Sequence, residues 1–195
     1  MSHFDARIYW PQPKQGHTIT NYFSSRIIQT YTRDYYDGFR LRQRIKLKWD
    51  CDWYYRIDPI RGVLEYRDDY PPKWYNWPWQ YAREVSCVPG KEIEWGGNEQ
   101  TGTTIVRQCE TSGLFGQYGS QVIIFHEIIP FYETKAGTFM EVLVLTYGQQ
   151  WGGGRIDGAK MWFAPGLGQI RAEWRRNGAP TGYFMELLET RGMVA

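Results

Sequence analysis

Pairs of carboxylates are the one arrangement in this sequence whose residue types could carry out general acid–base chemistry. The candidate pairs are Glu92 with Glu94, Glu133 with Glu141, and Asp68 with Asp69. A glycosidase needs two carboxyl groups about 5–10 Å apart, and the 10 tryptophans of the chain offer rings on which a sugar could stack. Sequence spacing does not show which carboxylates meet across a sheet, and Glu92 with Glu94 is more simply the exposed face of a short strand. We therefore predict no catalytic residue, with a glycosidase-like enzyme as an alternative.

Histidine and cysteine add few candidates for catalysis or metal binding. The histidines are His3, His17 and His126, and the cysteines are Cys51, Cys87 and Cys109. The cysteines are widely spaced and form no Cys-x-x-Cys pair, so no zinc site is expected. His126 and Glu127 would point to opposite faces of a strand, which predicts a partly buried histidine with a satisfied hydrogen bond. Without a nucleotide, phosphate or metalloprotease motif, we predict no metal and no cofactor.

The composition of the chain favours strands. Any catalytic or metal-binding site would therefore have to be positioned by a β-sheet. The 195 residues suit one domain, residues 1–195, and 17% of them are aromatic, with 21 glycines and 10 prolines. Aromatic residues favour strands, whereas glycine and proline mark turns. No apolar run approaches the roughly 20 residues of a membrane-spanning helix. The net charge of +2 gives no bulk attraction to nucleic acid, which is not expected as a partner.

Alternation of apolar and polar residues predicts an antiparallel meander with very little helix. The clearest segment is 39–49, where Phe39, Leu41, Ile45, Leu47 and Trp49 alternate with basic residues, as in a strand with one buried face. Further strands are expected at 18–31, 53–57, 63–67, 83–88, 103–110, 121–129, 140–147, 160–164, 169–174 and 183–190. About ten strands joined by short turns indicate one long sheet.

Three motifs resemble a known class of proteins. The residues Tyr9-Trp10-Pro11, followed by Gly16 and Tyr22, resemble the opening of bacterial lipoproteins and related uncharacterised proteins that form a single-sheet β domain. Ala136-Gly137-Thr138-Phe139 is similar to their middle motif, and residues 162–171 resemble their strand, Ala-Pro-Gly-x-Gly turn and return strand. The resemblance implies a long curved sheet like the open half-barrel of outer-membrane lipoprotein carriers. It also implies an apolar or carbohydrate ligand on the concave face.

The Ala-Pro-Gly-x-Gly motif also has a physical explanation of its own. Pro165 has a fixed φ, and Gly166 and Gly168 accept positive φ, which suits a tight strand reversal. We predict that at least one of the two glycines has a positive φ. No helix is expected after the turn, so a phosphate site is not expected there.

A row of basic residues is the first candidate surface for a partner. It consists of Arg40, Arg42, Arg44, Lys46 and Lys48, which would lie about 7 Å apart on one face of a single strand. The row is interpreted either as a solvated face compensated by acidic residues of neighbouring strands or as a contact for an acidic protein. Binding of nucleic-acid or lipid phosphate is a third reading.

An aromatic, proline-rich insertion at about 70–82 is the second candidate surface. Its partner-binding candidates are Trp74, Tyr75, Trp77 and Trp79. Because proline supplies no ladder donor, we predict an ordered loop here and no central strand. The rings could close the open end of the half-barrel, anchor a protein contact, or stack against a sugar.

Together these features favour a non-enzymatic structural or interaction protein that is a subunit of a larger oligomeric assembly of protein subunits. The N-terminal residues show neither a basic and apolar signal segment nor a lipid-accepting cysteine. We therefore expect synthesis in the cytoplasm without a signal peptide, and interpret the chain as a phage virion component from the tail, baseplate or capsid decoration. The alternative is a carrier that binds a ligand on the concave sheet.

Overall fold

A computed structural model of the chain describes residues 3–10, 17–23, 28–34, 39–45, 48–69, 84–86, 93–97, 99–110, 118–150 and 156–191. Side chains are described for residues 3–10, 58–64, 95–97, 99–106, 122–148, 150 and 156–189. In these parts of the chain nearly every element is a strand, and the single helix is α1 (Ala6–Tyr9). The prediction of an all-β protein with very little helix is confirmed.

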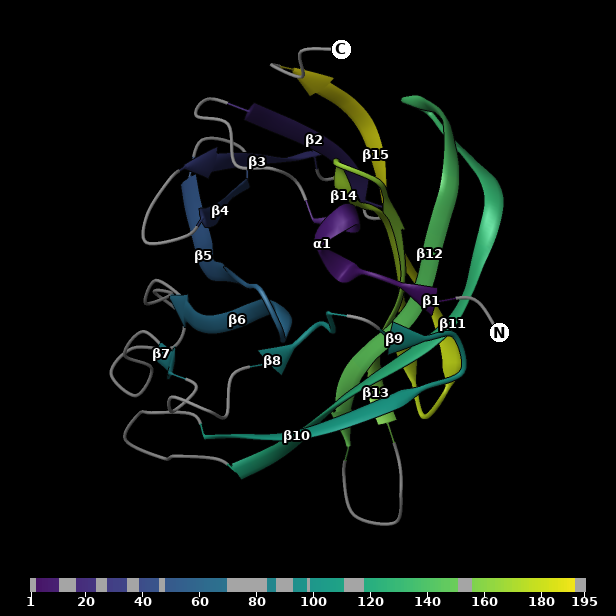
Figure 1. Cartoon of the computed structure of the whole chain (residues 1–195). Coiled ribbons are helices and arrows are strands. Elements are labelled where there is room, and N and C mark those ends of the chain that lie inside the picture. The colour runs from purple at the N-terminus through teal and green to yellow at the C-terminus, as the bar shows by residue number, and fades with distance from the viewer. Residues whose placement is uncertain are drawn as a thin grey trace.

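Most of the described strands belong to one long antiparallel sheet, which curls around α1 (Figure 1). In sheet order it runs through β10 (Thr104–Glu110), β11 (Tyr118–Thr134), β12 (Gly137–Gln150), β13 (Ile156–Ala164), β14 (Gly168–Arg176) and β15 (Ala179–Arg191). It continues through β2 (His17–Phe23), β3 (Ile28–Asp34), β4 (Phe39–Ile45), β5 (Lys48–Asp58), β6 (Gly62–Asp69) and β7 (Glu84–Ser86). Along this order, neighbouring strands are also neighbours in sequence, except where β15 pairs with β2.

Two short pairings complete the described architecture. β8 (Ile93–Glu94) pairs with β6, and β1 (His3–Phe4) pairs with β9 (Glu99–Gln100) in a separate two-stranded sheet. The first strand of the long sheet, β10, lies in contact with β7 and β8 without a ladder between them. The predicted open, curved sheet is thus confirmed. Across the described ranges, no helix has the length and apolar character needed to cross a membrane.

Two predicted strands are each divided in the structure. Residues 18–31 form parts of β2 and β3, with Tyr22 paired to Ile28 across the hairpin. Residues 39–49 are likewise divided. β4 ends at Ile45, which pairs with Lys48 at the start of β5. Continuous alternation of apolar and polar residues does not reveal a tight hairpin, because the same period continues in both strands.

β12 is buried on both faces, which a single-layer sheet would not require. Leu143 and Leu145 point into one apolar cluster, whereas Val142 and Val144 point into a second one. Successive side chains of a strand point to opposite faces, so an uninterrupted apolar run is expected where both faces are covered.

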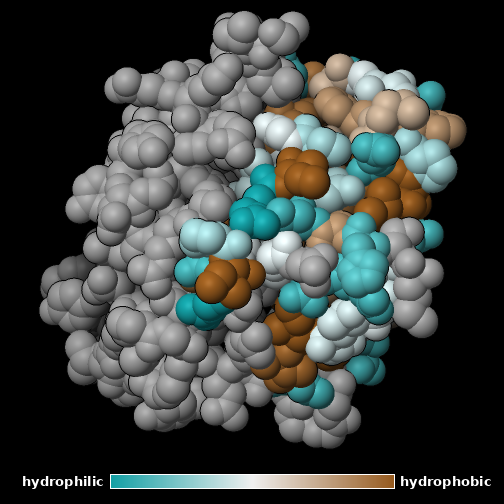
Figure 2. Space-filling view, viewed as in Figure 1, coloured by the Kyte–Doolittle hydropathy of each residue, from teal (hydrophilic) through white to brown (hydrophobic). Residues whose placement is uncertain are grey.

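The distal part of the β11–β12 hairpin extends past β13 and bends. Glu141 has a positive φ of 52°, and Pro130 lies opposite it in the strand register. Pro130 is tolerated because β10 pairs with β11 only as far as Ile124, so β11 is an edge strand at this point. Beyond the bend, Phe131 and Met140 are 56% and 61% exposed, and apolar side chains gather at the hairpin tip in Figure 2.

The prediction for the Ala-Pro-Gly-x-Gly turn is confirmed. Gly166 has a φ of 70° and lies between β13 and β14, and Gly168 has a φ of 92° and begins β14. A Cβ on Gly166 would meet no atom within 4 Å. Backbone conformation, and not crowding, therefore requires glycine at position 166.

A substitution at this turn gives a direct test of that explanation. We expect Gly166→Val to lower the free energy of unfolding by roughly 1–3 kcal/mol, because a β-branched residue is strained at positive φ. Gly166→Asn should cost less, because asparagine adopts this conformation more readily. Chemical denaturation followed by circular dichroism measures both, and equal stability of the two variants would contradict the explanation.

Candidate ligand-binding face

The inner face of the curled sheet carries an apolar cluster that the chain's own N-terminal residues cover. The sheet contributes Val63, Ile105, Ile123, Phe125, Leu143, Leu145 and Phe163, and Trp95 lies beside them. The covering residues are Phe4, Ala6, Tyr9 and Trp10. They belong to residues 4–10, here called the N-terminal plug. Figure 1 shows α1, the centre of this plug, inside the curve of the sheet.

The plug is built as a single capped helical turn. Asp5 is the N-cap, and its side chain accepts a hydrogen bond of 2.9 Å from the backbone N–H of Arg7. The N–H of Trp10 donates to the carbonyl of Ala6 at 3.0 Å and ends the turn. Ala6 and Tyr9 are buried, whereas Ile8 is 57% exposed. One side of the turn therefore faces the sheet.

Trp10 lies among three aromatic rings. Its ring stacks on Phe163 at a centroid distance of 4.9 Å and an interplanar angle of 19°. Its ring also lies 4.8 Å from that of Trp95, which in turn lies 4.9 Å from that of Tyr147. Burial of one such side chain stabilises the folded state by about 1.5–3 kcal/mol. Trp10 is only 6% exposed, so it is a main anchor of the plug.

Phe4 provides a second anchor at the other end of the plug. Its ring lies 4.7 Å from the ring of Phe125 and 6.3 Å from that of Tyr9, with the latter pair edge to face. The preceding residue, His3, meets Gln100 across the β1–β9 pair, with 2.7 Å between their Nε2 atoms. The plug is therefore held by apolar contacts at both ends.

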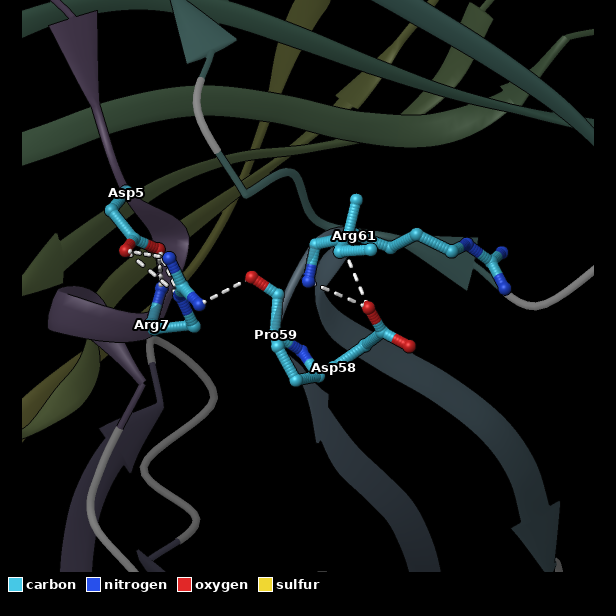
Figure 3. A network of polar contacts seen from close by, with 6 residues as sticks. Asp5, Arg7, Asp58, Pro59 and Arg61 are labelled. Atoms are coloured by element: carbon cyan, nitrogen blue, oxygen red, sulfur yellow. Dashed lines mark hydrogen bonds and ion pairs between the residues drawn. The ribbon is translucent and has the colours of Figure 1, made fainter.

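A polar contact joins the plug to the turn between β5 and β6 (Figure 3). Arg7 forms an ion pair with Asp5 and donates a hydrogen bond of 2.8 Å from Nη1 to the carbonyl of Pro59. Asp58 accepts hydrogen bonds from the backbone N–H groups of Ile60 and Arg61 and so shapes that turn. We call the Asp5–Arg7–Pro59 contact the N-terminal latch.

The charge of Asp5 is stabilised in the latch. Burial alone would raise its pKa, but the hydrogen bonds from the side chain and backbone of Arg7 outweigh burial, and the positive charge of Arg7 adds to them. The pKa of Asp5 is therefore lowered from its ordinary value. The latch is charged on both sides at neutral pH.

The plug also meets the Ala-Pro-Gly-x-Gly turn directly. The backbone N–H of Gly166 donates a hydrogen bond of 2.7 Å to the carbonyl of Ile8. Together with the stacking of Trp10 on Phe163, this contact unites the first and third motifs of the sequence resemblance. The two motifs are distant in sequence and form one structural unit.

The second apolar cluster lies on the other face of β12. Charged side chains surround one of its members, Trp162. Lys160 Nζ lies 5.4 Å from the Trp162 ring centroid, and Arg171 Cζ lies 5.6 Å from it. Arg171 also forms an ion pair of 2.7 Å with Glu186. Tyr132 of the bent hairpin packs on the same ring, with centroids 5.6 Å apart. These contacts hold the hairpin against β13 and β14.

The predicted carboxylate pairs are not brought together as an enclosed site where the structure describes them. Glu133 pairs with Thr138 and is exposed, and Glu141 is exposed three steps further along the ladder. That offset is about 10 Å along the strands. The side chains of Asp68, Asp69 and Glu94 lie outside the described residues, as does Glu92. In the described ranges no group of three metal-binding side chains occurs.

His126 lies at a β-bulge of β11, where the register shifts between Phe125 and Glu127. Its Nε2 atom lies 2.8 Å from the hydroxyl of Thr146, as expected for a satisfied histidine, but the side chain is exposed and not buried. Although the side chain is exposed to solvent, the protein atoms around the ring partly desolvate it and lower its pKa. The charge of Lys160 lowers the pKa further, against the opposing effect of Glu127.

The lowered pKa of His126 predicts a pH dependence of stability. Below pH 6.5, roughly, the unfolded chain binds more protons at this residue than the folded chain does. The free energy of unfolding should therefore fall as the pH drops below about 6.5, until the folded histidine is also protonated. An NMR titration of the His126 ring in the folded chain should give a lower midpoint than the same titration of the chain unfolded in urea. The His126→Gln variant should lose this part of the pH dependence of stability. A midpoint equal to the unfolded value would contradict the prediction.

The predicted basic row does not lie on one strand. β4 carries Arg40, Arg42 and Arg44, with a register shift between Gln43 and Arg44, and Lys48 begins β5. Lys46 and all side chains of the row lie outside the described residues. In the register, Arg40 pairs with Asp34 of β3, and Arg42 pairs with Asp52 of β5. These pairings place acidic residues beside the row and favour the compensated interpretation.

Other predicted residues lie outside the part of the chain that the structure describes. They include all four aromatic candidates, Trp74, Tyr75, Trp77 and Trp79. The backbones of Cys51 and Cys109 lie in β5 and β10, but their side chains and the whole of Cys87 are not described. The contacts predicted for these residues remain predictions.

Comparison of the chain with known proteins finds similar chains among the solved structures. No family model matches the sequence, and the search of curated proteins finds no match. One similar structure is a Bacteroides fragilis protein, predicted to be exported, with a YmcC-like fold; it has 11% identity and a TM-score of 0.44, covering 95% of this chain and 100% of that one. Another is a predicted lipoprotein from Parabacteroides distasonis, with 11% identity and a TM-score of 0.46, covering 96% and 100%.

Two predictions are corrected by these descriptions. The interpretation as a phage virion component is wrong, because the similar structures are described as an exported protein and a lipoprotein. The expected localisation, cytoplasmic synthesis without a signal peptide followed by a place in the virion, is wrong for the same reason. Both predictions depended on the expectation that the chain is made without a signal peptide. The resemblance to lipoprotein-like β domains is supported at the level of an all-β sheet.

Proposed function

We propose that the chain is a non-enzymatic binding protein that holds an apolar ligand, such as an acyl chain, on the concave face of its sheet. The observation that supports this proposal is the cover of that face. In the described residues the apolar inner cluster is covered by the plug at residues 4–10, and not by a second sheet or a long helix. A short segment that lies outside the strands of the long sheet is a cover that a ligand of similar polarity can replace.

The lining of the face favours an apolar ligand over a carbohydrate. Sugars are recognised by several polar groups as well as by stacking, whereas apolar ligands need mainly hydrophobic and aromatic walls. The sheet residues of the inner cluster are aliphatic or phenylalanine, and Trp95 and Tyr147 add rings beside them.

Equilibrium binding tests this proposal directly. The fluorescence of N-phenyl-1-naphthylamine, a neutral apolar probe, should rise with saturation when the purified chain is added. Oleate should displace the probe, and maltohexaose should not. Absence of saturable binding would contradict the proposal, and displacement by the oligosaccharide alone would support the carbohydrate alternative in its place.

A further inference from the structure

The N-terminal plug occupies the same surface on which the proposed ligand would bind. Phe4 packs on Phe125, and Trp10 stacks on Phe163. Both partners belong to the inner face of the sheet. A ligand and the plug therefore cannot bury these two rings at the same time.

Departure of the plug would leave the backbone of the long sheet intact. None of residues 4–10 belongs to a strand of that sheet, whose first strand in sequence, β2, begins at His17. The plug is joined to loops of the sheet by the hydrogen bond from Gly166 to Ile8 and by that from Arg7 to Pro59. Both contacts are made at turns, so opening the plug breaks no ladder hydrogen bond of the long sheet. It separates only Phe4 from Glu99 in the short β1–β9 pair.

The latch lies where it can set how often the plug opens. Arg7 is partly exposed, and its guanidinium reaches from the plug to the β5–β6 turn while it is held by Asp5 (Figure 3). Its contacts are polar and are made outside the apolar cluster. A change to the latch can therefore alter the stability of the closed state without altering the surface that would hold a ligand.

We propose that the plug is a built-in competitor for the ligand-binding face and that the Asp5–Arg7–Pro59 latch sets the fraction of molecules that are open to a ligand. This inference rests on the proposed function, because it names what regulates that same face. The apparent affinity of a ligand is reduced in proportion to the population of the binding-competent state. Loosening the latch should increase affinity, and fixing the plug should decrease it.

Two loosened variants test the first half of the proposal. Arg7→Ala removes the contact to Pro59 and should tighten binding of N-phenyl-1-naphthylamine about threefold or more, since a hydrogen bond to a charged group is lost only from the closed state. Asp5→Asn keeps an N-cap acceptor but removes the ion pair, and it should act in the same direction. Arg176→Ala is the matched control, because this exposed arginine ends β14 at the opposite end from the turn that contacts the plug.

A locked variant tests the second half. His3 and Gln100 are register partners whose side chains meet across the antiparallel β1–β9 pair, a geometry compatible with a disulfide. The variant with His3→Cys and Gln100→Cys should bind the probe at least about fivefold more weakly when oxidised and regain its affinity when reduced. The wild-type chain, treated with the same oxidant and reductant, controls for its own three cysteines.

The results separate the two proposals. Tighter binding by the loosened variants together with weaker binding by the oxidised locked variant supports the plug as a competitor. Equal saturable binding by all forms overturns the competitor proposal and leaves the apolar-ligand function in place. Absence of probe binding in every form, including the loosened variants, overturns the proposed function itself.

Discussion

Replacing Trp10 with alanine is expected to lower the free energy of unfolding by about 3–5 kcal/mol, as large-to-small changes of a buried aromatic residue do. The change would remove the stack on Phe163 and the contact with Trp95, and it would leave a cavity between the plug and the sheet. Chemical denaturation followed by circular dichroism measures the effect.

A neighbour on the same plug provides the control for Trp10. Ile8 is 57% exposed, so Ile8→Ala should change the free energy of unfolding by less than about 0.5 kcal/mol. A loss below about 1 kcal/mol for Trp10→Ala would show that the plug does not form part of the core.

A comparably large effect is expected for Gly62→Ala, roughly 2–5 kcal/mol of lost stability. Gly62 has a φ of 85°, and a Cβ at this position would lie 2.7 Å or less from backbone atoms of Gly96 and Gly97. Backbone cannot move aside as a flexible side chain can. The close approach holds Trp95, whose N–H donates to the carbonyl of Val63 at 2.8 Å, against the start of β6.

Gly102 separates crowding from backbone conformation in this prediction. It has a φ of 91°, but its Cβ would meet no atom within 4 Å. Gly102→Ala should therefore cost only about 1–2 kcal/mol, the ordinary penalty of the left-handed region. Thermal unfolding of both variants gives the comparison, and equal losses would contradict the role of the close approach.

The fold class could be predicted from the sequence because its signals are local. The segment 140–147 contains a run of apolar residues that favours a strand, and the structure has β12 there. The turn at Gly166 and Gly168 could also be predicted, because positive φ is a property of a single residue. Neither inference needs knowledge of distant contacts.

The features that the sequence did not reveal depend on distant contacts or on interrupted patterns. Pairing of β15 with β2 joins the two ends of the chain, and no local pattern encodes it. The bend at Glu141 depends on one residue with positive φ in an otherwise regular strand. The division of 39–49 into β4 and β5 was missed because alternation continues through the hairpin.

The candidate site was missed for a related reason. A helix of four residues is too short to show a helical period, so residues 4–10 carried no recognisable element. One available signal was Asp5 before Ala6, since aspartate is a favoured N-cap. Another was the pair Tyr9 and Trp10, which entered the sequence resemblance without a structural role. The burial of Trp10 depends on Phe163, more than 150 residues away in the sequence.

The most direct test of an apolar ligand on the concave face uses residues that neighbour one another on β12 but point to opposite faces. Methyl NMR spectra recorded with a doxyl-labelled stearic acid should show broadening of the Leu143 and Leu145 signals, which belong to the inner cluster. The signals of Val142 and Val144, in the second cluster, should broaden much less. Broadening confined to Val142 and Val144, or no broadening at saturating stearate, would contradict binding on the concave face.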